Sequence, residues 1–224
     1  MKKWIPFLCV LLMLSITHDA LAQRRITTKR FNAGFVLGLN FSQIDGDDQF
    51  GYRKPGICVG LSGMARLSKR TELVIELLFS ERGASPDSDF NAQNKKARNI
   101  HLSYAEVPLL FHYKSAKNNA GFYTVKLEGG FYFSRLLRTQ IEERFLGGLS
   151  PTDVRLSDYQ NQFNSDEIGF LLGGGYYFSP HFGVNFRHFM AFNRLLDERV
   201  DLDNQSVDLK LRSYFLQLQM VYLL

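Results

Sequence analysis

Charged side chains recur inside segments that are otherwise rich in large apolar residues. The positions are Arg66, Glu76, Glu106, Lys126, Glu128 and Arg187, and Gln217 is an uncharged member of the same set. Such carboxylates and cations can line a path for protons or ions if water reaches them. They can instead pair with one another and close a narrow interior. We predict that these seven residues form a closed polar network in the interior of the fold, a lumen polar network if the fold is hollow, with a narrow pore as the alternative.

A histidine and a serine, His101 and Ser103, share one face of a strand. Nucleophilic catalysis needs a base within hydrogen-bond reach of the hydroxyl and a third group that orients the base. Glu106 has the opposite parity, so an orienting acid would have to come from another strand, and none is evident in the sequence. We therefore predict no catalytic residue and keep a lipid-modifying enzyme as an alternative.

Three other patterns are candidates for ligand binding. Asp45-Gly46-Asp47-Asp48 lacks the spaced ligand set of a calcium loop and is more typical of a solvated turn. Gly173-Gly174-Gly175 is not followed by a helix, so room for a lumen side chain explains it better than a phosphate cradle. Cys58 is expected to be a small inward-facing residue. We predict no bound metal and no cofactor.

Eight segments with a period of two residues would position these side chains. The clearest pair lies within 167–192, where Phe170 and Phe186 alternate with Gly169 and Arg187 on either side of a turn at Ser179-Pro180. The other segments are 32–42, 56–67, 71–82, 98–114, 121–137 and 210–224. In the fourth segment along the chain Pro108 cannot donate a ladder hydrogen bond, which predicts a bulge or a locally unpaired position.

The connections between these segments alternate in length. Those at 43–55, 84–97, 138–164 and 193–209 are long and polar, whereas those at 68–70, 115–119 and 179–180 are short. An eight-stranded meander then has its long loops at one end and its tight turns at the other. This asymmetry is typical of an outer-membrane barrel. We predict an all-β fold, an eight-stranded antiparallel up-and-down transmembrane β-barrel.

The volume of the interior decides which face of each strand points inward. Eight strands enclose a space that side chains nearly fill, and the apolar faces carry many rings, including Phe35, Phe131 and Phe186. The opposite faces are rich in glycine and carry the charges. Lys or Arg facing lipid at the midplane would cost about 2–4 kcal/mol each. We therefore predict rings outward and charges inward. A soluble periplasmic lipocalin-like barrel, with its apolar face inside, is the alternative.

The first 22 residues have the features of a secretory signal peptide. Lys2 and Lys3 precede an apolar run that is too short to span a bilayer, and cleavage is predicted between Ala22 and Gln23. We predict a signal peptide at 1–22, a short periplasmic segment at 23–31 and the barrel domain at 32–224. Cleavage leaves 25 basic and 21 acidic residues, a scattered excess of +4 that does not indicate nucleic-acid binding.

Three stretches resemble the PorT-like outer-membrane β-barrel proteins of Bacteroidetes. They are Ala33–Ser42, Glu76-Leu77-Leu78-Phe79-Ser80 followed by Gly83, and Tyr104–Leu110 with Tyr113. The resemblance implies an eight-stranded barrel in the outer membrane and no shared catalytic residues. The spacing of His101 and Ser103 is, in addition, similar to that of the lipid A deacylase barrels.

These observations predict an integral protein of the Gram-negative outer membrane that is not an enzyme. Its expected partners are outer-membrane lipid, the barrel assembly machinery, and an extracellular ligand or protein that binds loops 43–55, 84–97, 138–164 and 193–209. The longest loop, 138–164, is the first candidate for that surface, because loops on a rigid scaffold commonly carry recognition.

Overall fold

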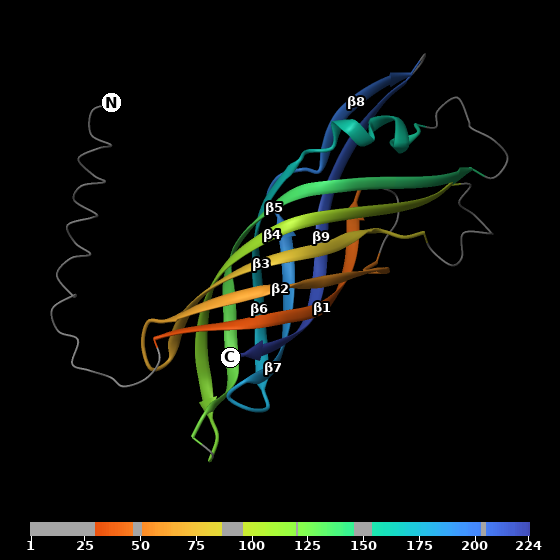
Figure 1. Cartoon of the computed structure of the whole chain (residues 1–224). Helices are drawn as coiled ribbons and strands as arrows, with labels where there is room; N and C mark the ends of the chain where they lie inside the picture. Colours follow the sequence, from red (N-terminus) through yellow and green to blue (C-terminus); the bar gives the residue numbers. More distant parts are fainter. Residues whose placement is uncertain (1–29, 47–50, 87–95, 120, 146–153, 203–204) are drawn as a thin grey trace, which may run out of the picture. The chain divides into compact units, whose positions relative to one another are not determined.

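The computed structural model describes residues 30–46, 51–86, 96–119, 121–145, 154–202 and 205–224. Eight antiparallel strands close into a barrel, in the order β1 to β7 followed by β9, and β9 pairs back to β1 (Figure 1). They are β1 (Phe31–Asp45), β2 (Lys54–Arg66), β3 (Thr71–Ala84), β4 (Lys96–Lys117), β5 (Tyr123–Phe145), β6 (Asp166–Tyr177), β7 (Phe182–Ala191) and β9 (Gln205–Leu223). The predicted eight-stranded antiparallel barrel is confirmed.

The pairing of residues around the ring gives the stagger of the strands. The path from Phe31 leads through Ala65, Leu73, Phe111, Gly129, Leu172, His188 and Leu216 to Phe41. It therefore returns to β1 ten residues beyond its starting point. Such a stagger tilts the strands against the barrel axis, and eight tilted strands leave an interior that side chains fill.

The large apolar side chains point away from this interior. Phe131 is 62% exposed and Phe186 is 53% exposed, whereas Arg187, the residue after Phe186, is fully buried. The outward rings and aliphatic side chains form a continuous apolar belt around the barrel, as a lipid environment requires. The soluble lipocalin-like alternative is wrong, because it needs the opposite orientation.

Beyond the belt the two faces of the strands exchange their character: apolar side chains point inward and charged side chains point outward. The longest strands, β4 and β5, continue past Ser103, where a β-bulge interrupts their register. There Ile100 and Leu102 point inward and are fully buried, while Arg138 and Glu142 point outward and are exposed. The reversal is expected where water replaces lipid around the wall, because apolar surface then leaves the solvent only by facing inward. The bulge therefore lies near the extracellular edge of the belt.

Part of the region predicted as long loops is ordered structure. The prediction of a loop at 193–209 is wrong, since β8 (Leu196–Leu202) forms a hairpin with the beginning of β9 and pairs with no other described strand. Within 138–164, β5 extends to Phe145, and a 3-10 helix, η1, covers Leu156–Gln162. No helix among the described residues is long and apolar enough to cross a bilayer.

Pro108 interrupts the pairing of β4 with β3 as expected. The paired residues run up to Ile75 and Leu109 and resume at Leu78 and Glu106 with the register unchanged. On its other side Pro108 pairs with Tyr132 of β5. The proline therefore produces a locally unpaired position without a bulge.

Candidate functional site

The middle of the lumen is occupied by an ion cluster centred on Arg187 of β7. Its guanidinium donates to both oxygens of Glu76 on β3, at 2.6 and 2.9 Å, and to both oxygens of Glu128 on β5, at 3.0 Å each. Gln219 of β9 accepts a further hydrogen bond at 3.2 Å, and His112 Nε2 lies 2.9 Å from Glu128 Oε2. Because the partners sit on strands far apart in the ring, the cluster spans the barrel.

A glycine on β6 makes space for this arginine. A Cβ added at Gly173 would lie 2.9 Å from Arg187 Cγ and 2.4 Å from the Phe186 carbonyl oxygen. Both distances are below normal van der Waals contact, so a larger residue would displace the guanidinium or the backbone. This agrees with the interpretation of the 173–175 glycines as room for a lumen side chain.

A second cluster, centred on Arg82 of β3, lies toward the extracellular end. Its nitrogens are 3.1 Å from Glu167 Oε1 and 3.4 Å from Glu106 Oε2, although neither contact has hydrogen-bond geometry. The guanidinium stacks 3.9 Å from the ring centre of Tyr104 and 4.4 Å from that of Phe215. Cation–π contact favours a desolvated arginine in this position.

Aromatic rings complete the barrier at this level. Phe189 and Phe215 stack with ring centres 4.2 Å apart, and Tyr132 packs edge-on against Phe189 at 5.2 Å. The Tyr132 hydroxyl donates to Glu167 Oε1 at 2.9 Å. These rings point inward, unlike the rings of the apolar belt, and they fill the space beside Arg82.

The third cluster closes the periplasmic end around one buried carboxylate. Glu72 accepts hydrogen bonds from Lys114 at 2.6 Å and Lys126 at 3.2 Å, and Arg66 Nε lies at 4.0 Å. Lys126 Nζ also lies 3.8 Å from the ring centre of Tyr177. Three cations therefore share one carboxylate at this end of the lumen.

A group of uncharged polar side chains lies between the central and extracellular clusters. Gln217 donates to Asn40 Oδ1 at 3.1 Å and to Cys58 Sγ at 3.3 Å, and Asn40 donates to Ser80 Oγ at 2.9 Å. Cys58 is fully buried and faces inward. The lumen thus contains polar contacts from the periplasmic end to the edge of the belt.

Above the belt an apolar cap closes the barrel. It joins five wall residues to residues in or directly beside η1 and the β8–β9 hairpin. The wall residues are Ile44, Ala84, Ile100, Leu102 and Tyr104, and the others are Val154, Leu156, Phe163, Leu195, Leu196, Leu209 and Leu211. The hairpin and η1 lie at the same end of the barrel (Figure 1). We call this group the extracellular cap. It is the buried core of the part of the protein that faces water.

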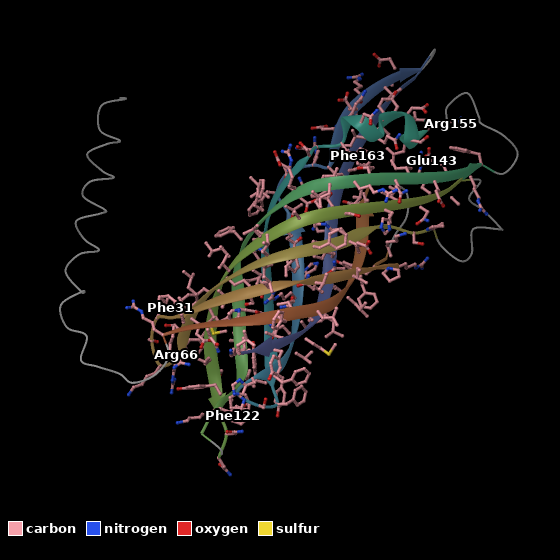
Figure 2. All side chains as sticks on the ribbon, viewed as in Figure 1. Phe31, Arg66, Phe122, Glu143, Arg155 and Phe163 are labelled. Atoms are coloured by element: carbon pink, nitrogen blue, oxygen red, sulfur yellow. The ribbon has the colours of Figure 1, made fainter. Side chains whose placement is uncertain are left out.

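Glu143 fixes η1 within the cap. Its carboxylate accepts hydrogen bonds from the backbone amides of Leu156 and Ser157, at 3.0 Å each, and pairs with Arg98 Nε at 2.9 Å. Arg98 also donates to the Val154 carbonyl at 2.8 Å. Figure 2 shows Glu143, Arg155 and Phe163 together at this end. The amide groups at the start of η1, which have no partner within the helix, are thereby satisfied.

The residues predicted to line the lumen are distributed over these clusters. Glu76, Glu128 and Arg187 meet in the central one, Glu106 lies in the extracellular one, Lys126 in the periplasmic one, and Gln217 between the first two. Arg66 lies at the periplasmic mouth, and its side chain is 40% exposed. The prediction omitted Glu72, Arg82, His112, Lys114 and Glu167, although each has inward parity on a predicted strand.

The candidate catalytic pair has a neighbour that the sequence did not reveal. His101 Nε2 lies 3.6 Å from Glu81 Oε1, on the adjacent strand β3, so an acid does face the imidazole. Ser103 is only 7% exposed. Among the described residues no hydrogen bond joins the His101 imidazole to the Ser103 hydroxyl.

The other predicted sites lie partly or wholly outside the described residues. These are the cleavage position at Ala22 and Gln23, the Asp45–Asp48 turn beyond Gly46, and the loop residues 47–50, 87–95 and 146–153. Within the part of the chain that the structure describes, no group of three His, Cys, Asp or Glu side chains is placed to hold a metal ion.

The chain matches the family model described as outer membrane protein beta-barrel domain over residues 21–197, more than half of its length. No curated protein matches the sequence. Solved structures with a similar arrangement include Ail, the attachment invasion locus protein of Yersinia pestis, at 10% identity and a TM-score of 0.44, over 88% of this chain and 100% of that one.

Two further solved structures with a similar arrangement are Neisserial surface protein A and the OprF barrel domain of Pseudomonas aeruginosa. The Neisserial protein is 12% identical, with a TM-score of 0.42 over 87% of this chain and 97% of its own. The N-terminal β-barrel domain of OprF from P. aeruginosa is 9% identical, with a TM-score of 0.39 over 86% and 98%. From its family match and its outward apolar belt, the chain belongs to the outer membrane protein beta-barrel domain family and is an integral barrel of the Gram-negative outer membrane.

Proposed function

We propose that this protein is a closed, non-enzymatic barrel that anchors a folded binding surface outside the cell. The observation that carries the proposal is the filled interior, in which the Arg187 and Arg82 clusters cross the lumen and the extracellular cap covers it. A narrow pore would need a continuous path of water past both arginines. A family relationship to the PorT-like barrels of Bacteroidetes is part of the proposal and rests on 33–42, 76–83 and 104–113.

The binding surface would consist of η1, the β8–β9 hairpin and the ends of β4 and β5. These elements are exposed on their outer side, as at Asp158 and Glu198. On their inner side they pack against the barrel wall through the apolar residues of the extracellular cap. A surface fixed in this way loses little conformational entropy when a partner binds. The partner is expected outside the cell, because the long connections of such barrels lie there.

Site-specific photo-crosslinking in living cells tests this role. A photoreactive amino acid at Asp158 or Glu198 is expected to capture a discrete extracellular protein or polysaccharide. The same amino acid at Phe131, in the apolar belt, serves as the control and is expected to capture lipid. Capture of no discrete partner from any position on η1 or the hairpin would contradict the proposed display of a binding surface.

A second candidate function, hydrolysis of an outer-membrane lipid, is favoured by one observation. Glu81 can orient the His101 imidazole, and both side chains lie on the outer face near the extracellular edge of the belt. Catalysis would further require the imidazole to reach the Ser103 hydroxyl. Mass spectrometry of lipid A from cells with and without His101→Ala and Ser103→Ala decides between the two functions. Identical lipid A in all strains would exclude the hydrolytic function.

A further inference from the structure

The periplasmic end of the barrel has an unbalanced positive charge. We define this end by the described residues 65–73, 113–119, 121–126 and 177–183, which form the three short turns and the strand ends beside them. They contain six lysines and arginines and one side-chain carboxylate. The cations are Arg66, Lys69, Arg70, Lys114, Lys117 and Lys126, and the carboxylate is Glu72. Figure 2 shows Arg66 and Phe122 at this end.

Half of these cations are engaged by Glu72, as described above: Lys114 and Lys126 inside the lumen and Arg66 at its periplasmic mouth. The other half are exposed: Lys69 and Arg70 lie in the turn between β2 and β3, and Lys117 is the last residue of the adjacent strand β4. No ion pair with a carboxylate is formed by any of these three among the described residues. We call them the basic rim.

The basic rim lies at the edge of the apolar belt. Arg70 Nη1 donates to the hydroxyl of Tyr113 at 3.3 Å, and Tyr113 points outward from β4 with a 39% exposed side chain. This hydrogen bond, and to a smaller extent the hydroxyl of Tyr123, raises the pKa of Arg70. Tyrosine rings at a membrane–water interface sit at the level of the lipid headgroups. The Arg70 guanidinium is therefore held at headgroup depth on the outer side of the barrel.

We propose that the basic rim binds the phosphate of anionic phospholipid headgroups in the periplasmic leaflet of the outer membrane. A guanidinium is suited to a phosphate because it presents two parallel N–H donors. Lys69 and Lys117 add point charges at the same end of the barrel. The same three cations would attract a soluble anion. A soluble anion, however, has no acyl chains that could contact the apolar belt beside them.

Native mass spectrometry of the folded full-length mature chain tests the proposal. The protein is loaded with equal amounts of phosphatidylglycerol and phosphatidylcholine that carry the same acyl chains, and the retained lipids are counted. The wild-type protein is expected to retain phosphatidylglycerol preferentially. Each cation near an anionic surface adds about 1 kcal/mol, or roughly a fivefold preference. Arg70→Gln should reduce the preference about fivefold, and the triple variant Lys69→Gln/Arg70→Gln/Lys117→Gln by on the order of a hundredfold.

The matched control removes three exposed cations from the opposite end, in the triple variant Arg138→Gln/Arg144→Gln/Arg155→Gln. It should keep the wild-type preference. An equal loss in both triple variants, or no preference in the wild type, would overturn the assignment. A third arm adds inorganic phosphate in large excess. Retention of phosphatidylglycerol supports headgroup binding at the membrane surface, whereas its release would show a site for phosphate alone and would also overturn the assignment.

Discussion

Arg187 and Glu76 are 111 residues apart in the sequence and form a two-pronged ion pair across the lumen, with N–O distances of 2.6 and 2.9 Å. Glu128 completes the arrangement from a third strand. A buried ion pair of this kind adds little net stability compared with apolar packing, but removal of one partner leaves a buried charge uncompensated. The pair therefore makes the barrel dependent on all three residues together.

Arg187→Met should lower the free energy of unfolding by about 3–5 kcal/mol, because Glu76 and Glu128 remain buried without their cation. Urea titration of the detergent-folded barrel measures this change. Arg135→Met removes an exposed ion pair with Asp166 and should cost at most about 1 kcal/mol. The triple variant Arg187→Met/Glu76→Gln/Glu128→Gln should recover part of the loss. An Arg187→Met protein as stable as Arg135→Met would show that the central cluster is not formed.

Gly173→Ala should destabilise the barrel by about 1–3 kcal/mol, since the new methyl group overlaps the Phe186 carbonyl and Arg187 Cγ. Gly63→Ala is the control, because a Cβ there meets its nearest neighbour, Ile75 Cγ2, at 3.6 Å. Urea titration of both variants under the same conditions gives the comparison. Equal stabilities would mean that Gly173 is not needed to accommodate the arginine.

Glu143→Ala should loosen η1 and leave β6 and β7 unaffected. The amides of Leu156 and Ser157 lose their acceptor, a change of about 1–3 kcal/mol in local stability. Hydrogen exchange followed by mass spectrometry should show faster exchange over 154–163 and unchanged exchange in β6 and β7. Glu142→Ala, at the adjacent exposed position, should leave both regions as in the wild type. Unchanged protection of η1 in Glu143→Ala would contradict the role of Glu143 in the cap.

A side-chain contact on the outer wall joins Tyr52 to His188. Tyr52 lies between β1 and β2, and its hydroxyl is 2.9 Å from His188 Nε2 on β7. His188 points outward between Phe186 and Met190, so Tyr52→Phe should leave its imidazole unpaired at a cost of about 1–3 kcal/mol. The double variant Tyr52→Phe/His188→Leu should be more stable than Tyr52→Phe alone. Additive effects in this double-mutant cycle, measured by urea titration, would show that the two side chains do not interact.

The fold and its orientation could be predicted because they depend on local alternation. Phe170 and Phe186 against Gly169 and Arg187 identify two faces, and the limited volume of an eight-stranded interior decides which one points inward. The same alternation also places some side chains of the opposite chemistry on each face, where residue type alone would have misplaced them. Phe189 and Phe215 point inward because the glycine-rich wall leaves room for them beside Arg82, and His188 points outward because Tyr52 satisfies it.

The contacts within the site could not be predicted, because they depend on the ten-residue stagger of the ring. Glu72 meets Lys114 and Lys126, and Glu106 meets Arg82, only at that register. Glu81 faces His101 for the same reason. The β8–β9 hairpin was missed because its residues are polar on their exposed side and their apolar partners come from the distant elements of the extracellular cap.

The most direct test of the closed lumen is the current through planar lipid bilayers that contain the purified, folded wild-type protein. Because the Arg187 and Arg82 clusters and the extracellular cap block the water path, no discrete conductance steps are expected above the baseline of protein-free bilayers. Reproducible conductance steps from the wild-type protein, absent when unfolded protein is added instead, would show an open path and contradict the closed lumen.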